Sequence, residues 1–128
     1  MPTFPVVTGD VLTSTIFNGL PAFTVQTAKT VDYTAASGDE YQQLIPMNKA
    51  TAVAFKIPTD ATYAFPVGTV ITVLNIGAGT CTISAVTPGT TTVLSAGAVA
   101  AQPTLGQYKS AACIKTAANA WYIVGGIA

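Results

Sequence analysis

The stretch over residues 65–85 limits what this chain can fold into, because it predicts two β-strands separated by a short glycine-containing break. Its first half carries a run of β-branched residues over 70–76, which favours an extended and largely buried backbone. Its second half, 80–85, alternates apolar and hydroxyl residues, as a strand with one buried face does. Gly77 and Gly79 stand at the break, where glycine can adopt the positive φ of a tight turn. The stretch therefore predicts a β-hairpin.

The first strand of this hairpin is apolar on both faces, with Val70 and Leu74 on one and Ile71 and Val73 on the other. Such a strand is either central in a two-layer domain or covered by a partner chain. Trp121 lies in the last predicted strand, where an aromatic side chain commonly anchors a sheet. The residues predicted to lie in the core or at a trimer interface are therefore Val70, Ile71, Val73, Leu74 and Trp121.

Further short strands are predicted along the chain, divided by glycine and proline turns. They cover residues 23–28, 41–47, 51–57, 90–94, 99–101, 107–116 and 121–124. Pro46 indicates an edge or a bulge in its strand, and no internal repeat is evident. Short strands at this spacing, with almost no helix, indicate a sandwich or a barrel. We predict an all-β fold with a β-sandwich domain over residues 23–128.

Residues 1–22 are predicted to form an N-terminal arm, in which Asp10 is placed to cap one short helix. The β-branched residues in that segment make the helix marginal by itself. The arm is either a strap across its own domain or a segment that docks on a neighbour, since it carries more apolar surface than a free terminus needs. The predicted docking residues are Phe4, Val6, Leu12, Ile16 and Phe17.

Charge is scarce in this chain. Charged residues make up 8% of the sequence, the net charge is zero, and histidine and arginine are absent. A free monomer normally has about a quarter of its residues charged. The chain therefore either hides much of its surface in an assembly or relies on threonine and serine for wetting, and we favour assembly. The lysines are scattered, so the sequence lacks the basic stripe that nucleic-acid binding needs.

The residues that usually carry catalysis are missing. General acid–base chemistry commonly uses histidine or paired carboxylates, and the one adjacent acidic pair, Asp39-Glu40, is interpreted as a solvated turn. No calcium-loop spacing occurs, and two cysteines without histidine cannot complete a typical structural zinc site. The glycines at 77 and 79 begin like a dinucleotide fingerprint, but a strand follows where a helix is required. We predict that the chain is not an enzyme and has no cofactor and no metal site.

The sequence carries no recognisable membrane span or secretory signal, and its first basic residue is Lys29. We therefore expect the chain to be made and retained in a cytoplasm, without a membrane partner. In that setting Cys81 and Cys113 stay reduced and act as small buried apolar residues. A disulfide between neighbouring strands is the alternative.

Residues 65–69 (FPVGT), followed by an apolar strand, Gly-Ala-Gly and a Thr/Ile strand, resemble a β-module of tailed-phage virion proteins. The resemblance continues over residues 108–116 and 119–126 and covers the chain from about residue 23 onward. This module recurs at the ends of tail fibres and in small head-decoration (cement) proteins. Its motifs belong to a scaffold and carry no chemistry of their own.

The resemblance implies a jelly-roll-like sandwich and a structural role. As a capsid decoration protein, the chain would bind and stabilise the assembled head as a homotrimer. Its partner would be the major capsid protein or another virion protein, and the N-terminal docking residues would supply the contact. It would be located on the capsid surface after assembly in the host cytoplasm.

The alternative implied by the same resemblance is a tail-fibre or adsorption module that binds host surface glycan through exposed aromatic residues. A fibre normally carries a long repetitive shaft before its terminal knob. No shaft is recognisable in this sequence, which favours the decoration protein.

Overall fold

The computed structural model describes residues 25–41 and 44–128, and within them the regular structure consists entirely of β-strands. The predicted N-terminal arm, its helix and its docking residues lie outside the described residues. The strands are β1 (Tyr33–Thr34), β2 (Leu44–Met47), β3 (Val53–Ile57), β4 (Val70–Asn75), β5 (Cys81–Ala85), β6 (Thr92–Ser95), β7 (Thr104–Leu105), β8 (Ser110–Ala117) and β9 (Ala120–Gly125).

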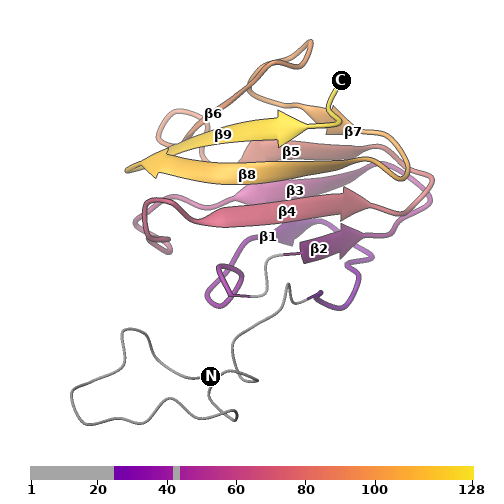
Figure 1. Cartoon of the computed structure of the whole chain (residues 1–128), viewed down its shortest axis with the longest axis horizontal. Coiled ribbons are helices and arrows are strands. Elements are labelled where there is room, and N and C mark those ends of the chain that lie inside the picture. Colours follow the sequence, from indigo (N-terminus) through magenta and orange to yellow (C-terminus); the bar gives the residue numbers. More distant parts are fainter. Residues whose placement is uncertain (1–24, 42–43) are drawn as a thin grey trace, which may run out of the picture.

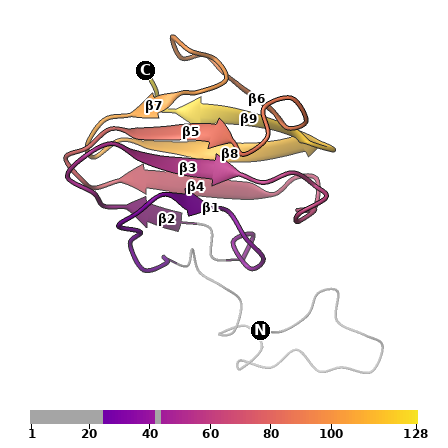
Figure 2. The same ribbon diagram turned by 180° about the vertical axis from the view of Figure 1, so that it is seen from behind.

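The strands form two sheets that lie one over the other. One is four-stranded in the order β1-β3-β5-β7, and the other is five-stranded in the order β2-β4-β8-β9-β6. The five-stranded sheet is nearer the viewer in Figure 1, and the four-stranded sheet is nearer in Figure 2. The prediction of an all-β fold is thereby confirmed, and the arrangement of the two sheets is sandwich-like.

Both sheets mix parallel and antiparallel pairs. The pairs β1–β3, β2–β4, β3–β5 and β6–β9 are parallel, whereas β4–β8, β5–β7 and β8–β9 are antiparallel. A jelly roll is built from antiparallel strands. The jelly-roll connectivity that we expected is therefore not confirmed by this pairing.

The predicted hairpin over residues 65–85 is wrong, although both of its strands exist. β4 pairs with β2 and β8 in one sheet, whereas β5 pairs with β3 and β7 in the other. Residues 76–80 therefore carry the chain from one sheet to the other, and we call such a connection an arch. Because each strand finds its partners elsewhere in the chain, local alternation cannot distinguish an arch from a hairpin turn.

Two arches stack in register on each other. Residues 48–52 connect β2 to β3 in the same way that residues 76–80 connect β4 to β5. Leu44 pairs with Thr72 and Val53 with Cys81, so both strands of the unit repeat at the same offset along the chain. The strand–arch–strand unit is a structural repeat that the sequence does not reveal.

The glycines of the second arch are needed for close approach and not for positive φ, which corrects the turn interpretation. A Cβ on Gly79 would lie 1.8 Å from the carbonyl oxygen of Thr51, and one on Gly77 would lie 2.4 Å from the backbone nitrogen of Lys49. The Gly79 amide donates to the Lys49 carbonyl at 2.9 Å. The arches touch through their backbones, and only a residue without Cβ fits between them.

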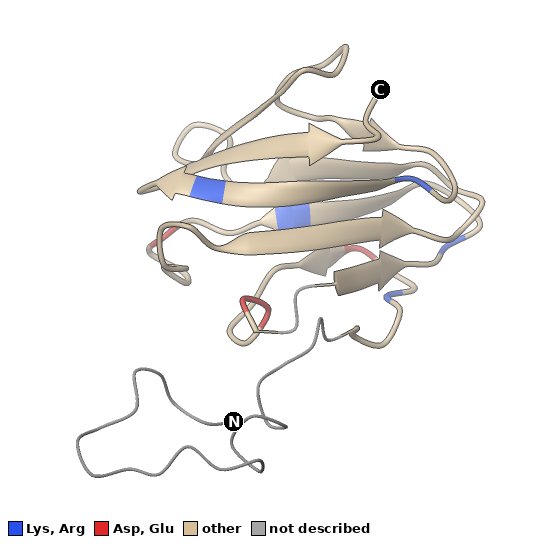
Figure 3. Cartoon of the chain, in the orientation of Figure 1, with Lys and Arg blue, Asp and Glu red and all other residues tan. Residues whose placement is uncertain are grey.

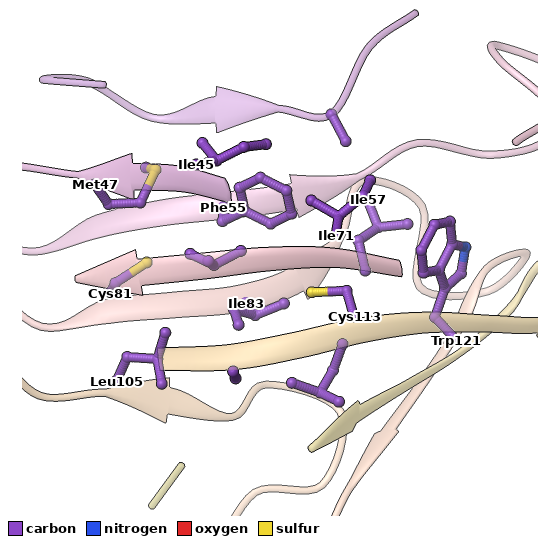
Figure 4. Close-up of a cluster of buried hydrophobic side chains, with 14 of the residues drawn as sticks. Ile45, Met47, Phe55, Ile57, Ile71, Cys81, Ile83, Leu105, Cys113 and Trp121 are labelled. Atoms are coloured by element: carbon purple, nitrogen blue, oxygen red, sulfur yellow. The ribbon is translucent and has the colours of Figure 1, made fainter. Parts of the chain in front are cut away.

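One hydrophobic core fills the space between the sheets. It includes Phe55, Ile57 and Val53 from β3, Ile71 and Val73 from β4, and Ile83, Leu105, Cys113 and Trp121 from the strands that follow (Figure 4). Phe65, in the connection before β4, contacts the Trp121 ring edge-on with ring centroids 5.7 Å apart. Val53, Phe55 and Ile57 alternate with half-buried residues in β3 and share its buried face.

Some predicted strand boundaries are wrong. Residues 99–101 are not in a strand, and β7, the antiparallel partner of β5, lies between the strands predicted over 99–101 and 107–116. Residues 25–29 form only isolated parallel bridges to β2, at Val25 and Lys29. Pro46 lies in β2, an outer strand of its sheet, as its proline indicates.

Candidate assembly surface

The two-sided apolar strand predicted from the sequence is explained by the outer face of the five-stranded sheet. β4 points Ile71, Val73 and Asn75 into the core and Val70, Thr72 and Leu74 outward, since side chains alternate along a strand. The outward side chains are half-buried. No other described element lies over them in Figure 1.

Pairing with the neighbouring strands extends this apolar surface across the sheet. Val70 pairs with Ile114, Ile114 with Tyr122 and Tyr122 with Leu94, which makes one continuous row over four strands. A second row runs from Leu44 through Thr72 and Ala112 to Val124. We call this surface the apolar outer face; it comprises Leu44, Val70, Leu74, Leu94, Ala112, Ile114, Tyr122 and Val124, with the hydroxyls of Thr72, Thr92 and Ser110.

A groove of about 410 Å³ lies at the β6–β9 side of this face. Leu94, Tyr122 and Val124 line it together with Ile127 near the C-terminus. The first three are also its exposed apolar side chains, with exposed fractions of 42%, 47% and 51%. A large apolar side chain from another molecule would fit such a groove.

The outer face of the four-stranded sheet is different in character. Its outward residues are Thr34, Ala54, Lys56, Thr82, Ser84 and Thr104, by the same alternation and register. Hydroxyls and one lysine dominate there, whereas none of the outward strand residues of the apolar outer face is charged. The blue segment near the arrowhead of β8 in Figure 3 is Lys115, whose side chain is buried. The two outer faces of the molecule therefore differ: one is rich in hydroxyls and carries a lysine, and the other is largely apolar.

The residues predicted to be core or trimer interface divide between these two roles. Ile71, Val73 and Trp121 lie in the core, each almost fully buried. Val70 and Leu74 lie on the apolar outer face and are half-buried. The contribution of any of them to a trimer stays a prediction.

A buried ion pair holds together the end of the sandwich that lies away from the arches. The Lys115 side chain is 2% exposed, and its Nζ donates to Asp60 Oδ1 at 2.7 Å and to the Phe65 carbonyl at 2.6 Å. Asn119, a left-handed residue in the β8–β9 turn, donates its amide to Asp60 Oδ2 at 3.2 Å. These contacts fasten the connection before β4 to the turn after β8.

Asp39 is not in a solvated turn, which corrects our interpretation of the acidic pair. It is 4% exposed and accepts hydrogen bonds from Tyr33 Oη at 2.8 Å, Gln26 Nε2 at 2.7 Å and the Ala36 amide at 2.8 Å. Burial and the hydrogen bond to Asp39 raise the pKa of Tyr33. Glu40 accepts from the Tyr63 hydroxyl, which raises the pKa of Tyr63. The pair therefore fixes a loop.

Both cysteines are free and buried. Burial raises the pKa of Cys81 to about 11 and also raises the pKa of Cys113. A thiol with a raised pKa is mostly protonated near neutral pH and is a poor nucleophile. The two side chains act as small apolar core residues, as expected from the sequence.

Asn75 is a buried polar residue that the sequence reasoning did not single out. Its Nδ2 donates to the carbonyls of Gly79 and Leu105, each at 2.8 Å, and its Oδ1 accepts from the Gly77 amide at 3.1 Å. It thereby satisfies backbone groups inside the arch. An Asn between an apolar strand and a Gly-x-Gly break is the sequence signal that could have indicated it.

Within residues 25–41 and 44–128, no group of three or more His, Cys, Asp or Glu side chains could hold a metal ion. The same part of the chain contains no helix of the length and apolarity that crossing a membrane requires. Comparisons with protein-family models, curated proteins and solved structures find no match.

Proposed function

We propose that this chain is a structural protein of a phage virion, namely a capsid decoration protein that binds the assembled head as a homotrimer. The observation that carries the structural role is the apolar outer face, which has no charged strand residue on a sheet otherwise open to water. The assignment to a phage particle rests on the sequence resemblance over residues 65–69 and 108–126. The proposal uses the two-sheet fold and does not depend on jelly-roll connectivity.

The mechanism is stabilisation by selective binding. A protein that binds the assembled shell and not its separated subunits stabilises the shell by RT ln(1 + [L]/Kd). Three linked copies multiply weak individual contacts through their effective concentration. Such a role needs a rigid scaffold and contact surfaces, and it needs no catalytic group.

The contact with the shell is assigned to the N-terminal segment, as the sequence predicts. Two of its docking residues, Phe4 and Phe17, would each contribute roughly 1.5–3 kcal/mol when buried. We expect the full-length double variant Phe4→Ser, Phe17→Ser to keep its oligomeric state but to bind heads at least about a hundredfold more weakly. Co-sedimentation of the chain with purified heads measures this, and unchanged binding would place the contact elsewhere.

Location in the particle tests the function itself. Antibodies against the chain, applied to purified virions of the encoding phage, are expected to label the head. Label at the tail tip would contradict decoration and favour the adsorption module that binds host glycan. Absence of the chain from virions would overturn the virion assignment altogether.

A further inference from the structure

We propose that the apolar outer face of the five-stranded sheet is the surface through which copies of this chain contact one another. The inference rests on the proposed homotrimer for the number of copies, and on the geometry of the face for the contact itself. The occupant of the face is therefore the same face of the neighbouring copies, with all three faces turned toward a common axis.

Charge favours a copy of the chain over an unrelated partner. In a symmetric assembly each residue near the axis approaches its own symmetry mate, so a charged residue there meets a like charge. The strand residues of the apolar outer face are all uncharged, and the face can therefore meet itself without repulsion. The other outer face carries Lys56, which would oppose its own copy.

The side chains of the face supply both projections and a recess. The row Val70–Ile114–Tyr122–Leu94 crosses the middle of the sheet, and the groove lies beside its Tyr122 end. Aromatic anchors in apolar pockets contribute most to protein interfaces. The exposed Tyr122 ring of one copy can enter the groove of the next while its hydroxyl stays at the wet rim.

The size of the face sets the expected affinity. Five strands about 4.8 Å apart and about 18 Å long give a flat area of roughly 430 Å². This area lies within the range of the largest apolar patch of a typical monomer, about 300–600 Å², and is at the low end for a stable interface. We therefore expect the chain to be an oligomer at micromolar concentration and to dissociate on dilution. On the shell, the high local concentration of the bound copies would keep the oligomer assembled.

Charge insertion on the two faces tests the proposal. Val124→Lys and Ile114→Lys place a lysine on the apolar outer face, and Thr82→Lys places one at a half-buried outward position of the other sheet. We expect sedimentation velocity to detect at least about a hundredfold weaker association for the first two and parental association for Thr82→Lys. Val124 is half-exposed, so its variant is expected to fold as the parent does by circular dichroism.

A mixing experiment distinguishes an interface from a folding defect. Val124→Lys and Val124→Glu chains should each be monomeric alone and should associate when mixed, because opposite charges then meet. Oligomeric Val124→Lys and Ile114→Lys chains, or failure of the mixture to associate, would overturn the proposal. A dimer that forms through this face would support the proposed contact and contradict the trimer. Head binding by a monomeric variant would show that decoration does not need self-association.

Discussion

The two ends of the sandwich are held together by different means. At the arch end, residues 48–52 and 76–80 stack through their backbones, and the neutral, buried Asn75 side chain supports the second arch. At the opposite end, longer connections are fastened by carboxylates, through Lys115–Asp60 and Tyr33–Asp39. The first end depends on the absence of side chains and the second on their charge.

This difference has a physical consequence for stability. Close backbone stacking tolerates no added volume, because both contacting groups belong to the main chain and cannot rotate away. A buried ion pair does not tolerate the loss of one partner, because that loss leaves an uncompensated charge. The two ends should therefore be destabilised by different substitutions and different solvent conditions.

The largest effect is expected from Gly79→Ala at the arch end. The new Cβ would lie 1.8 Å from the Thr51 carbonyl oxygen, so the two arches must separate. We expect a loss of about 3 kcal/mol or more in the free energy of unfolding, at the upper end for overpacking. Urea denaturation followed by circular dichroism measures it.

Gly89→Ala is the matched control, because a Cβ there meets nothing within 4 Å and its φ is not positive. Its unfolding free energy should stay within about 0.5 kcal/mol of the parent. Equal losses in the two variants would mean that the arches are not in close contact.

The opposite end is tested by Asp60→Asn. The substitution removes the charge that faces Lys115, whose buried ammonium then has neutral acceptors, the Phe65 carbonyl and the new amide oxygen. We expect a loss of about 2–3 kcal/mol, less than for a fully enclosed pair because Asp60 is partly exposed. Thermal or urea unfolding at neutral pH measures this change.

Lys115→Met removes the other partner of the ion pair, so its cost can be compared with that of Asp60→Asn. It leaves the partly exposed Asp60 carboxylate, which water and the Asn119 amide can still solvate, and it fills the same volume with an apolar chain. We expect it to cost less than Asp60→Asn. The reverse order would show that the lysine acts mainly through packing.

The sequence predicted what depends on local pattern. The strands predicted over 51–57 and 80–85 from alternation are observed as β3 and β5, and the chain turns at residues 118–119, between the strands predicted over 107–116 and 121–124. The hairpin prediction is wrong because the choice between an arch and a hairpin depends on where β2, β3 and β8 lie. Residues 65–85 do not encode those positions. The need for glycine at Gly77 and Gly79 was predicted correctly, but the reason is close backbone approach and not positive φ.

The candidate site was predictable only in part for a related reason. The two-sided apolar character of β4 was visible, and it indicated a covered face. The row from Val70 to Leu94 was not visible, since its members come from four strands brought together by pairing. Asp39 and Lys115 were missed as buried charges because their partners Tyr33 and Asp60 are set by tertiary structure.

The smallest effect concerns alkaline pH at the end that carries the carboxylates. Burial, followed by the hydrogen bond to Asp39, raises the pKa of Tyr33 above the ordinary value of 10. Because the folded state holds this proton more tightly than the unfolded state, the stabilisation is fully present below pH 10. It is lost as the pH rises from there through the folded pKa. Asn75 at the arch end does not titrate, so it contributes nothing to this pH dependence.

The comparison is between the parent and Tyr33→Phe, measured by urea denaturation from pH 8 to pH 11. Tyr33→Phe should be less stable at pH 8 by about 1 kcal/mol, because the Asp39 hydrogen bond is gone. The parent alone then loses up to about 1 kcal/mol per pH unit above 10, so the difference should shrink and disappear by pH 11. Other groups titrate equally in both chains and cancel. A difference that stays constant over this range would show that the Tyr33 proton is not linked to folding.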